Sequence, residues 1–203
     1  MSLRLRFLAR QFARPRGWVG RRLIAPWLNR ISRKETGLAL ERLEARAGER
    51  ILEIGFGGGA LLAALVAAGA RPTGADVSPA MTSRARRRFS GRAEIVDASV
   101  AALPFAAGTF DKAVSVNSLY FWENLRAAFG EIARVLRPGG RVVLVWESPE
   151  RLRRWPGHVY GFSVVDRTNA SGVASDSGFS NIRTDVEAGF LCLTAERCGA
   201  ESA

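Results

Sequence analysis

Short apolar runs followed by helix-forming stretches are the main pattern along this chain. Residues 50–54 form an apolar run between two glycines, which is typical of a buried parallel strand. Residues 60–69 have helix-forming composition and end at a glycine. Near the other end, only two residues separate the runs 181–187 and 190–197, and this spacing predicts a hairpin.

The N-terminal segment has a different pattern, in which apolar and basic positions alternate with helical periodicity. Over residues 3–14 the pattern predicts a helix with an apolar stripe of Leu5, Leu8 and Phe12. A basic stripe of Arg6, Arg10 and Arg14 lies on the opposite side of the helix. Leu3 and Phe7 lie off the apolar stripe. The sequence RPRG at 14–17 interrupts the helix, and residues 18–31 resume it with two tryptophans among basic residues.

The net charge is concentrated in this segment, which we call the arm (residues 1–34). The chain has a formal charge of +11, and the arm alone carries nine Arg, one Lys and no acid. Residues 35–203, with 20 basic and 19 acidic side chains, are nearly neutral. We therefore divide the chain into the arm and one domain at 35–203, because 203 residues with 47% hydrophobic composition suit a single core.

Four interpretations of the arm follow from its pattern. It forms a pair of short helices that cover the active site, or it binds an anionic membrane surface, which suits basic amphipathic segments with Trp and Phe. Contact with nucleic acid is disfavoured, because the charge outside the arm is nearly balanced. A cleaved targeting peptide is the fourth reading, although the segment has little Ser.

Cysteine usage and hydropathy restrict the compartment. Cys192 and Cys198 match neither a disulfide framework nor a set of metal ligands, and the chain has a single histidine. No window reaches the roughly 20 apolar residues that cross a bilayer. We expect a cytoplasmic protein without a metal. The alternative location is the inner membrane surface, which the protein would contact peripherally through the arm.

The glycine turn after residue 54 indicates a nucleotide or nucleoside cofactor. Gly55, Gly57 and Ala60 fit the dinucleotide spacing, and Asp76 follows 21 residues after Gly55, so NAD and an oxidoreductase stay open at this point. Two further features favour another cofactor. Glu53 and a third glycine, Gly59, extend the motif to E-x-G-x-G-x-G. A second acid, Asp97, follows Asp76 by another 21 residues.

Four stretches together resemble the class I S-adenosylmethionine-dependent methyltransferases, in particular the group with the quinone-biosynthesis C-methyltransferases. They are ILEIGFGGG, TGADVSPAM, AEIVDASVAALPFAAGTFDKAVSVNSLYFW and EIARVLRPGGRVVLV, and the resemblance covers about residues 45–197. It implies a doubly wound α/β fold with a mostly parallel, seven-stranded Rossmann-like sheet whose last strand is antiparallel. It also implies S-adenosylmethionine as the cofactor.

Each part of that cofactor needs a different contact. Gly55, Gly57 and Gly59 leave room for the methionyl part against the backbone. Asp76 at a strand end accepts hydrogen bonds from both ribose hydroxyls. Glu53 organises the turn and the ammonium end.

The resemblance extends to the adenine. It implies that Asp97 accepts from the adenine amino group, while the backbone of Ala98 donates to the ring. Val77 and Met81 are the expected apolar walls.

Residues beyond the cofactor motifs point to the methyl acceptor. Asn117 and Tyr120 copy the N-x-x-Y spacing of amino-methylating enzymes, but Ser118 and Leu119 replace the two prolines of those enzymes. Asn117 and Tyr120 are therefore candidate catalytic residues, with Asn117 also near the cofactor, or else they belong to an aromatic packing cluster. His158 is the candidate general base, because its ordinary pKa lies near neutrality, and Glu147 is the alternative.

The predicted reaction is an in-line displacement that moves a methyl group to a small molecule, including an amphiphilic one. A lipid at a membrane surface, such as a phospholipid amine or a quinone-like ring, is the alternative acceptor. An NAD-dependent oxidoreductase is the alternative of a different class, but no catalytic Tyr/Lys pair is recognisable. We expect the acceptor site to combine the arm with residues 117–123 and 147–165.

Overall fold

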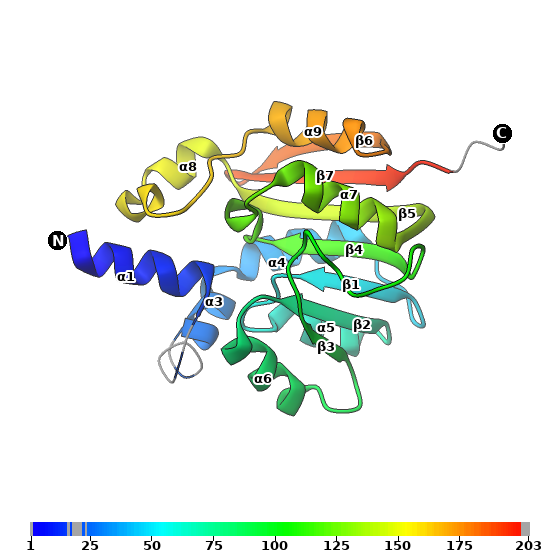
Figure 1. Ribbon diagram of the computed structural model, residues 1–203, viewed down its shortest axis with the longest axis horizontal. Helices are drawn as coiled ribbons and strands as arrows, with labels where there is room; N and C mark the ends of the chain where they lie inside the picture. The colour runs from blue at the N-terminus through cyan, green and yellow to red at the C-terminus, as the bar shows by residue number, and fades with distance from the viewer. Residues whose placement is uncertain (1, 16, 18–21, 23, 200–203) are drawn as a thin grey trace.

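A computed structural model describes residues 2–15, 17, 22 and 24–199 of the chain, and its centre is a seven-stranded sheet of order β3-β2-β1-β4-β5-β7-β6 (Figure 1). Every pairing among the first five strands is parallel, and β7 runs antiparallel to both of its neighbours. The predicted fold class is confirmed. The strands are β1 (Arg50–Ile54), β2 (Arg71–Asp76), β3 (Glu94–Asp97), β4 (Phe110–Val116), β5 (Leu136–Glu147), β6 (Phe179–Glu187) and β7 (Phe190–Arg197).

Helices cover both faces of this sheet, which explains why its central strands are continuously apolar. Ile51 and Leu52 are both fully buried but belong to opposite hydrophobic clusters, since neighbouring side chains of a strand point to opposite faces. Helices α4 (Arg33–Leu43) and α5 (Ala60–Ala67) pack on the Ile51 face, and α7 (Leu125–Val135) and α9 (Arg167–Asp176) on the Leu52 face. The other helices are α1 (Ser2–Ala13), α3 (Ala25–Ile31), α6 (Pro79–Arg88), α8 (Pro149–Arg153) and the 3-10 turns η2 (Leu119–Phe121) and η3 (Pro156–Val159).

The predicted terminal hairpin is confirmed as β6 and β7. Ala188 and Gly189 connect the strands, and both have left-handed backbone angles, with φ of 51° and 83°. Such angles match the twist of a tight two-residue hairpin turn. The antiparallel β7 therefore enters the sheet beside β5, where Leu191 and Leu193 are buried.

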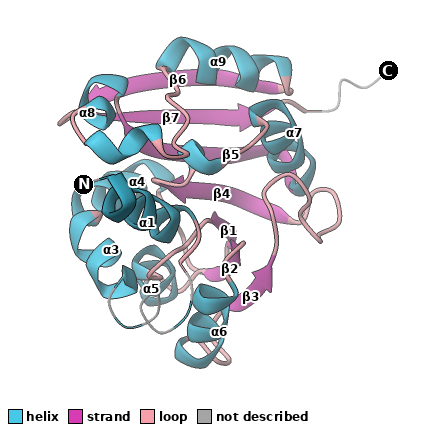
Figure 2. Ribbon diagram, turned by 60° about the vertical axis from the view of Figure 1, so that its left-hand side comes forward, coloured by secondary structure: helices cyan, strands magenta, loops and turns pink. Residues whose placement is uncertain are grey.

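The arm lies at the carboxyl ends of the parallel strands, where the arrowheads of β1 and β4 point toward α1 (Figures 1 and 2). Aromatic contacts attach α1 on two sides, because the Phe12 ring stacks on Trp27 of α3 at 5.0 Å and packs against Trp155 at 5.3 Å. Part of the predicted 18–31 segment lies outside the described residues. None of the helices in the described part is long and apolar enough to cross a bilayer.

Candidate functional site

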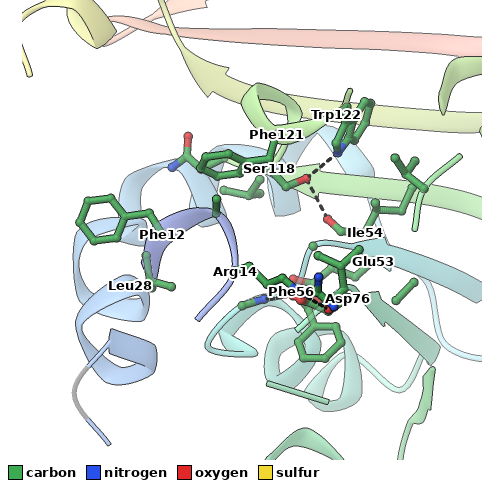
Figure 3. Close-up of a pocket in the computed structure, with 18 of the residues that line it drawn as sticks. Phe12, Arg14, Leu28, Glu53, Ile54, Phe56, Asp76, Ser118, Phe121 and Trp122 are labelled. Atoms are coloured by element: carbon green, nitrogen blue, oxygen red, sulfur yellow. Dashed lines mark hydrogen bonds between the residues drawn. The ribbon is translucent and has the colours of Figure 1, made fainter. Parts of the chain in front are cut away.

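A cavity of about 610 Å³ lies at the carboxyl ends of β1, β2 and β4, beside the arm (Figure 3). The strand order reverses here, since β2 lies on one side of β1 and β4 on the other. Open α/β sheets bind their ligands at such a switch point. We call this the first cavity. The predicted residues that line it are Glu53, Gly55, Gly57, Asp76, Val77, Ala98 and Asn117.

The glycine turn allows the backbone to approach this cavity. Gly55 and Gly57 line it and have left-handed φ angles of 70° and 47°. Gly55 is also required by packing, because a Cβ there would lie 2.5 Å from the Ser118 Cβ. Gly59 has a different role from the one predicted: it does not line the cavity, and a Cβ there would press on the Phe89 ring. The neighbouring Gly58 lines the cavity instead.

The Gly58 carbonyl oxygen has a set of donors that the sequence pattern does not reveal. Asn29 of the arm donates to it at 3.1 Å, and Arg84 and Arg88 of α6 donate at 3.0 and 3.1 Å. Burial, followed by the nearby Arg88 and Arg87 charges, lowers the pKa of the Arg84 guanidinium. These donors connect the glycine turn to the arm and to α6, and so hold it from two sides.

Asp76 is held in place by the turns on either side of it. One carboxylate oxygen accepts from the Gly57 N–H at 3.0 Å and the other from the Ser78 N–H at 2.8 Å. The side chain is only 8% exposed, and this burial raises its pKa against the opposing effect of the two hydrogen bonds. An acceptor fixed in this way at a strand end suits a diol, because each oxygen keeps a lone pair.

Glu53 presents a buried carboxyl group to the same cavity. Its Oε2 has no hydrogen-bond partner among the residues that the structure describes. Burial, together with the charge of Asp76, raises the pKa of Glu53 well above its ordinary value, while a hydrogen bond with the Leu62 backbone lowers it. An unsatisfied buried acceptor is costly, so this oxygen fits a ligand that brings a donor, such as an ammonium group.

Two of the predicted adenine contacts are not arranged as the resemblance implies. The Asp97 carboxylate does not line the cavity, because it accepts from the Thr82 hydroxyl at 2.5 Å and pairs with Arg86. These two partners, Thr82 first, lower the pKa of Asp97. Met81, a residue of α6, is fully buried and contributes to the core. Val77 and Ala98 do line the cavity, as predicted.

The arm covers the side of the cavity next to Asp76. The Arg14 Nε donates to the Val77 carbonyl at 3.0 Å, and the Ser78 hydroxyl donates to the Pro15 carbonyl at 2.5 Å. Phe12 of α1 and Leu28 of α3 also line the cavity, and Figure 3 shows them at a distance from Asp76. Arg14 and Pro15, which directly follow α1, are thus attached to the turn after β2.

A second cavity of about 670 Å³ adjoins the first and is mainly apolar. The arm, η2 and the region after β5 form its walls. Its lining consists of Leu8, Phe12, Ile24, Trp27, Leu28, Ile31, Ser32, Asn117, Tyr120, Phe121, Glu147, Leu152, Trp155 and Phe162. Five of these residues also line the first cavity: Phe12, Leu28, Ser32, Asn117 and Phe121.

Asn117 and Tyr120 lie together in this boundary. Asn117 has a left-handed φ of 53°, and its amide donates to Glu35 at 3.1 Å and to Ser32 at 3.3 Å. Its carbonyl oxygen accepts from the Tyr120 hydroxyl at 2.8 Å, and that hydroxyl accepts from the Glu147 N–H at 2.5 Å. Burial raises the pKa of Tyr120 far above its ordinary value, so the hydroxyl stays protonated.

His158, the predicted base, is not brought to either cavity. It lies in η3, where its Nδ1 is 2.7 Å from the Trp155 carbonyl oxygen. Glu147 lines the second cavity, with Arg151 at 3.4 Å from its carboxylate. Of the two candidate general bases, the geometry therefore favours Glu147, because this residue lines the second cavity and His158 does not.

Sequence reasoning also misses the hydrogen bonds around Ser118. Its hydroxyl lies 2.5 Å from that of Ser115 and accepts from the Trp122 indole N–H at 3.2 Å, as Figure 3 shows for Trp122. Ser118 is thereby fixed against the glycine turn. The replacement of proline by serine at this position in the N-x-x-Y spacing is the one signal of it in the sequence.

Known proteins resemble this chain in sequence and in fold. The family model described as "Methyltransferase domain" matches residues 52–144. A demethylmenaquinone methyltransferase of Tropheryma whipplei is 36% identical over 168 residues, which cover 79% of this chain and 70% of that protein. Another, of Clavibacter sepedonicus, is 42% identical over 100 residues, 48% of this chain but only 41% of that relative's length. A solved structure of an S-adenosylmethionine-dependent methyltransferase from Aquifex aeolicus superposes with a TM-score of 0.72 at 18% identity, covering 85% of this chain and 96% of that one.

Proposed function

Because this chain belongs to the class I S-adenosylmethionine-dependent methyltransferases, we propose that it moves the methyl group of S-adenosylmethionine to an amphiphilic small molecule held in the second cavity. The observation that carries the proposal is the shared wall between the two cavities. A cofactor in the first cavity and an apolar acceptor in the second meet at Phe12, Asn117 and Phe121. The NAD-dependent alternative is set aside by the family membership.

The residues of the first cavity fit the cofactor. The Asp76 carboxylate suits the ribose hydroxyls, and the unpartnered Glu53 oxygen suits the ammonium group of the methionyl part. Gly55 and Gly57 bring the backbone to the cavity wall beside them. When bound, the cofactor supplies a methyl group on a positively charged sulfur, which needs no further activation.

The protein's main task is then to align the acceptor and exclude water. Asn117 and Tyr120 form a fixed polar boundary, since the amide of Asn117 already donates to two partners and its carbonyl accepts from Tyr120. Around this boundary the lining is aromatic, with Phe12, Phe121 and Trp155. Such a wall suits a flat, apolar ring.

A quinone-like ring with an apolar tail is the acceptor that we propose, in preference to a phospholipid amine. The Asn117 carbonyl already accepts from Tyr120 and is held in that position, so it offers an amine one remaining lone pair and not an uncommitted acceptor. The relatives named above are demethylmenaquinone methyltransferases, which points to the same class of acceptor. The reduced, quinol form is required, because a ring carbon must supply the electron pair.

Methylation of a ring carbon releases one proton. The ring carbon attacks the methyl carbon, the carbon–sulfur bond breaks with its electron pair on sulfur, and the ring proton leaves to a base. Glu147 lies in the wall of the second cavity and is the carboxylate that we assign to receive it. Its backbone N–H is fixed by the Tyr120 hydroxyl.

A transfer assay with methyl-labelled S-adenosylmethionine tests the proposal. The purified protein is incubated separately with a short-chain prenyl naphthoquinol, the same compound kept oxidised, and phosphatidylethanolamine. Label on the quinol alone is the expected result. Label on the amine would overturn the acceptor class, and failure to bind S-adenosylhomocysteine in calorimetry would overturn the chemistry itself.

A further inference from the structure

The exposed apolar surface of this protein is concentrated on the arm. Leu3 is 80% exposed and Phe7 is 51% exposed on α1, and Leu8, Trp27 and Ile31 are exposed as well. Elsewhere in the described residues the large exposed apolar side chains are all valines: Val77, Val159, Val164 and Val186. Bulky apolar side chains in water mark a surface that meets another apolar phase.

Three of these exposed side chains also form the mouth of the second cavity. Leu8, Trp27 and Ile31 line the cavity and at the same time face the solvent. The mouth of the proposed acceptor site therefore has an apolar rim on the two helices of the arm. Such a rim suits an acceptor with a long apolar tail.

The arm that carries this apolar surface is also rich in basic side chains. None of the ion pairs found among residues 2–15, 17, 22 and 24–199 involves the arm. Two arginines have contacts within the protein, since Arg14 holds the Val77 carbonyl and Arg6 lies over the Tyr160 ring. Five further arginines are exposed and make no side-chain hydrogen bond to the described residues: Arg4, Arg10, Arg22, Arg30 and Arg33.

We propose that α1 and α3 dock this protein on an anionic lipid bilayer, with the mouth of the second cavity facing the lipid. Both features of the surface are then used. Leu3, Phe7 and Trp27 enter the boundary of the acyl chains, and the arginines meet the lipid headgroups. Neither signal alone gives firm attachment, but apolar contact and anionic attraction together do.

A nucleic acid is the weaker fit to the same surface. Phosphates would neutralise the arginines, but Leu3 and Ile31 gain nothing from a phosphate backbone and do not stack on bases. A second copy of the chain is also disfavoured by charge, because two arms without acids would repel each other. The unpaired cations and the aliphatic side chains are explained together only by an anionic apolar surface.

This inference rests on the proposed function, since a lipid-facing mouth has a purpose only if the acceptor is apolar. Vesicle flotation measures docking without turnover, so the docking proposal and the proposed function can fail separately. Full-length protein is mixed with vesicles of phosphatidylcholine alone or with 30% phosphatidylglycerol, and the floating fraction is measured. We expect flotation with the anionic vesicles and at least a five-fold smaller fraction with the neutral ones.

Paired variants separate the two signals. Leu3→Ser with Phe7→Ser removes the apolar contact, and Arg4→Glu with Arg10→Glu reverses the charge, while none of the four lines a cavity. Each pair is expected to reduce flotation at least five-fold. Two matched controls make the same chemical changes away from the arm and are expected to float like the unchanged protein: Val186→Ser, and Arg71→Glu with Arg87→Glu.

Three outcomes overturn the proposal. These are equal flotation of the arm variants and the unchanged protein, retention by single-stranded or duplex RNA but not by vesicles, and a change of oligomeric state in the arm variants with unchanged flotation. A final comparison uses turnover. The Leu3→Ser, Phe7→Ser protein is expected to lose at least five-fold in rate on a quinol embedded in anionic vesicles, but not on the same quinol in detergent, and equal losses in both would contradict docking.

Discussion

The Tyr120 hydroxyl donates to the Asn117 side-chain carbonyl across 2.8 Å, at the wall that separates the two cavities. The same hydroxyl accepts from the Glu147 N–H, while the Asn117 amide donates to Glu35 and Ser32. Tyr120 and Asn117 therefore join η2, the residue after β4, the end of β5, the start of α4 and Ser32 of the arm. A polar network of this kind fixes the boundary at which methyl donor and acceptor must meet.

Removing the Tyr120 hydroxyl tests whether it positions the acceptor. Tyr120→Phe leaves the part-buried Glu147 N–H and Asn117 carbonyl each short of a partner, which costs about 1–3 kcal/mol of unfolding free energy. We expect kcat to fall by roughly ten-fold or more, with the affinity for S-adenosylhomocysteine unchanged within about three-fold. Urea unfolding, steady-state kinetics and calorimetry measure the three quantities.

The other tyrosine gives the matched control for this change. Tyr160→Phe removes a hydroxyl that lines neither cavity and keeps the ring under Arg6, so we expect the kinetics of the unchanged protein. A merely structural role for Tyr120 would lower stability and leave the kcat of the folded fraction intact. That result would remove Tyr120 from the positioning of the acceptor.

Asp76 and Asp97 are expected to differ in their effect on the cofactor. Asp76→Ala removes a buried acceptor from the first cavity, and S-adenosylhomocysteine binding should weaken by about 1–3 kcal/mol, or roughly 5- to 150-fold. Asp97→Asn changes a carboxylate that Thr82 and Arg86 hold away from the cavity. Calorimetry should show less than about a three-fold change for Asp97→Asn, and equal losses for both variants would mean that Asp97 turns toward the ligand.

The sequence identifies the elements that carry the cofactor because their signals are local. The glycine turn, the strand-end acid Asp76 and the hairpin around Ala188 each depend on a few neighbouring residues and on burial that the apolar runs reveal. These predictions agree with the structure. The side of a helix that a residue faces is partly readable in α1. Of the predicted stripe, Leu5 and Phe12 are half-buried and Leu8 lines the second cavity although it is exposed, while Leu3, off the stripe, is exposed.

Contacts between distant segments are not readable in this way. The choice of Thr82 and Arg86 as partners for Asp97 depends on how α6 packs beside β3, and neither spacing nor composition records it. His158 is a natural base by its ordinary pKa, but the chain after β5 carries it outside both cavities. Whether Asp97 or His158 can contact a ligand depends on the direction of its side chain, and that direction is fixed only by packing between distant segments.

Burial of Glu53 predicts a specific pH dependence of stability. Its pKa is raised in the folded protein, so folding favours the protonated form, and the stability present at low pH is lost as the pH rises through the folded-state pKa. Glu53→Gln cannot ionise. The unfolding free energy of Glu53→Gln minus that of the unchanged protein should therefore become more positive from about pH 4.5 upward.

The difference between the two proteins is the quantity to measure, because Asp97 and Glu131 have lowered pKa values and change stability in the opposite direction. This difference in unfolding free energy is obtained by urea unfolding without cofactor, repeated at several pH values between about 4 and 8. A difference that stays constant across this range would contradict the raised pKa. Glu53→Gln should also bind S-adenosylhomocysteine more weakly, since a neutral amide replaces the partner of its ammonium group.

Gly55 and Gly91 have nearly the same backbone, with φ of 70° and 71°, but different surroundings, and this pair isolates the close approach at the glycine turn. A Cβ at Gly91 meets nothing within 4 Å, whereas at Gly55 it would lie 2.5 Å from the Ser118 Cβ. Gly91→Ala should therefore cost only the strain of a left-handed alanine, about 1 kcal/mol. Gly55→Ala should cost a further 1–3 kcal/mol or so, because the well-packed Ser118 must move. Urea unfolding compares the two, and similar losses would show that Ser118 gives way freely and that Gly55 is required by its backbone angle alone.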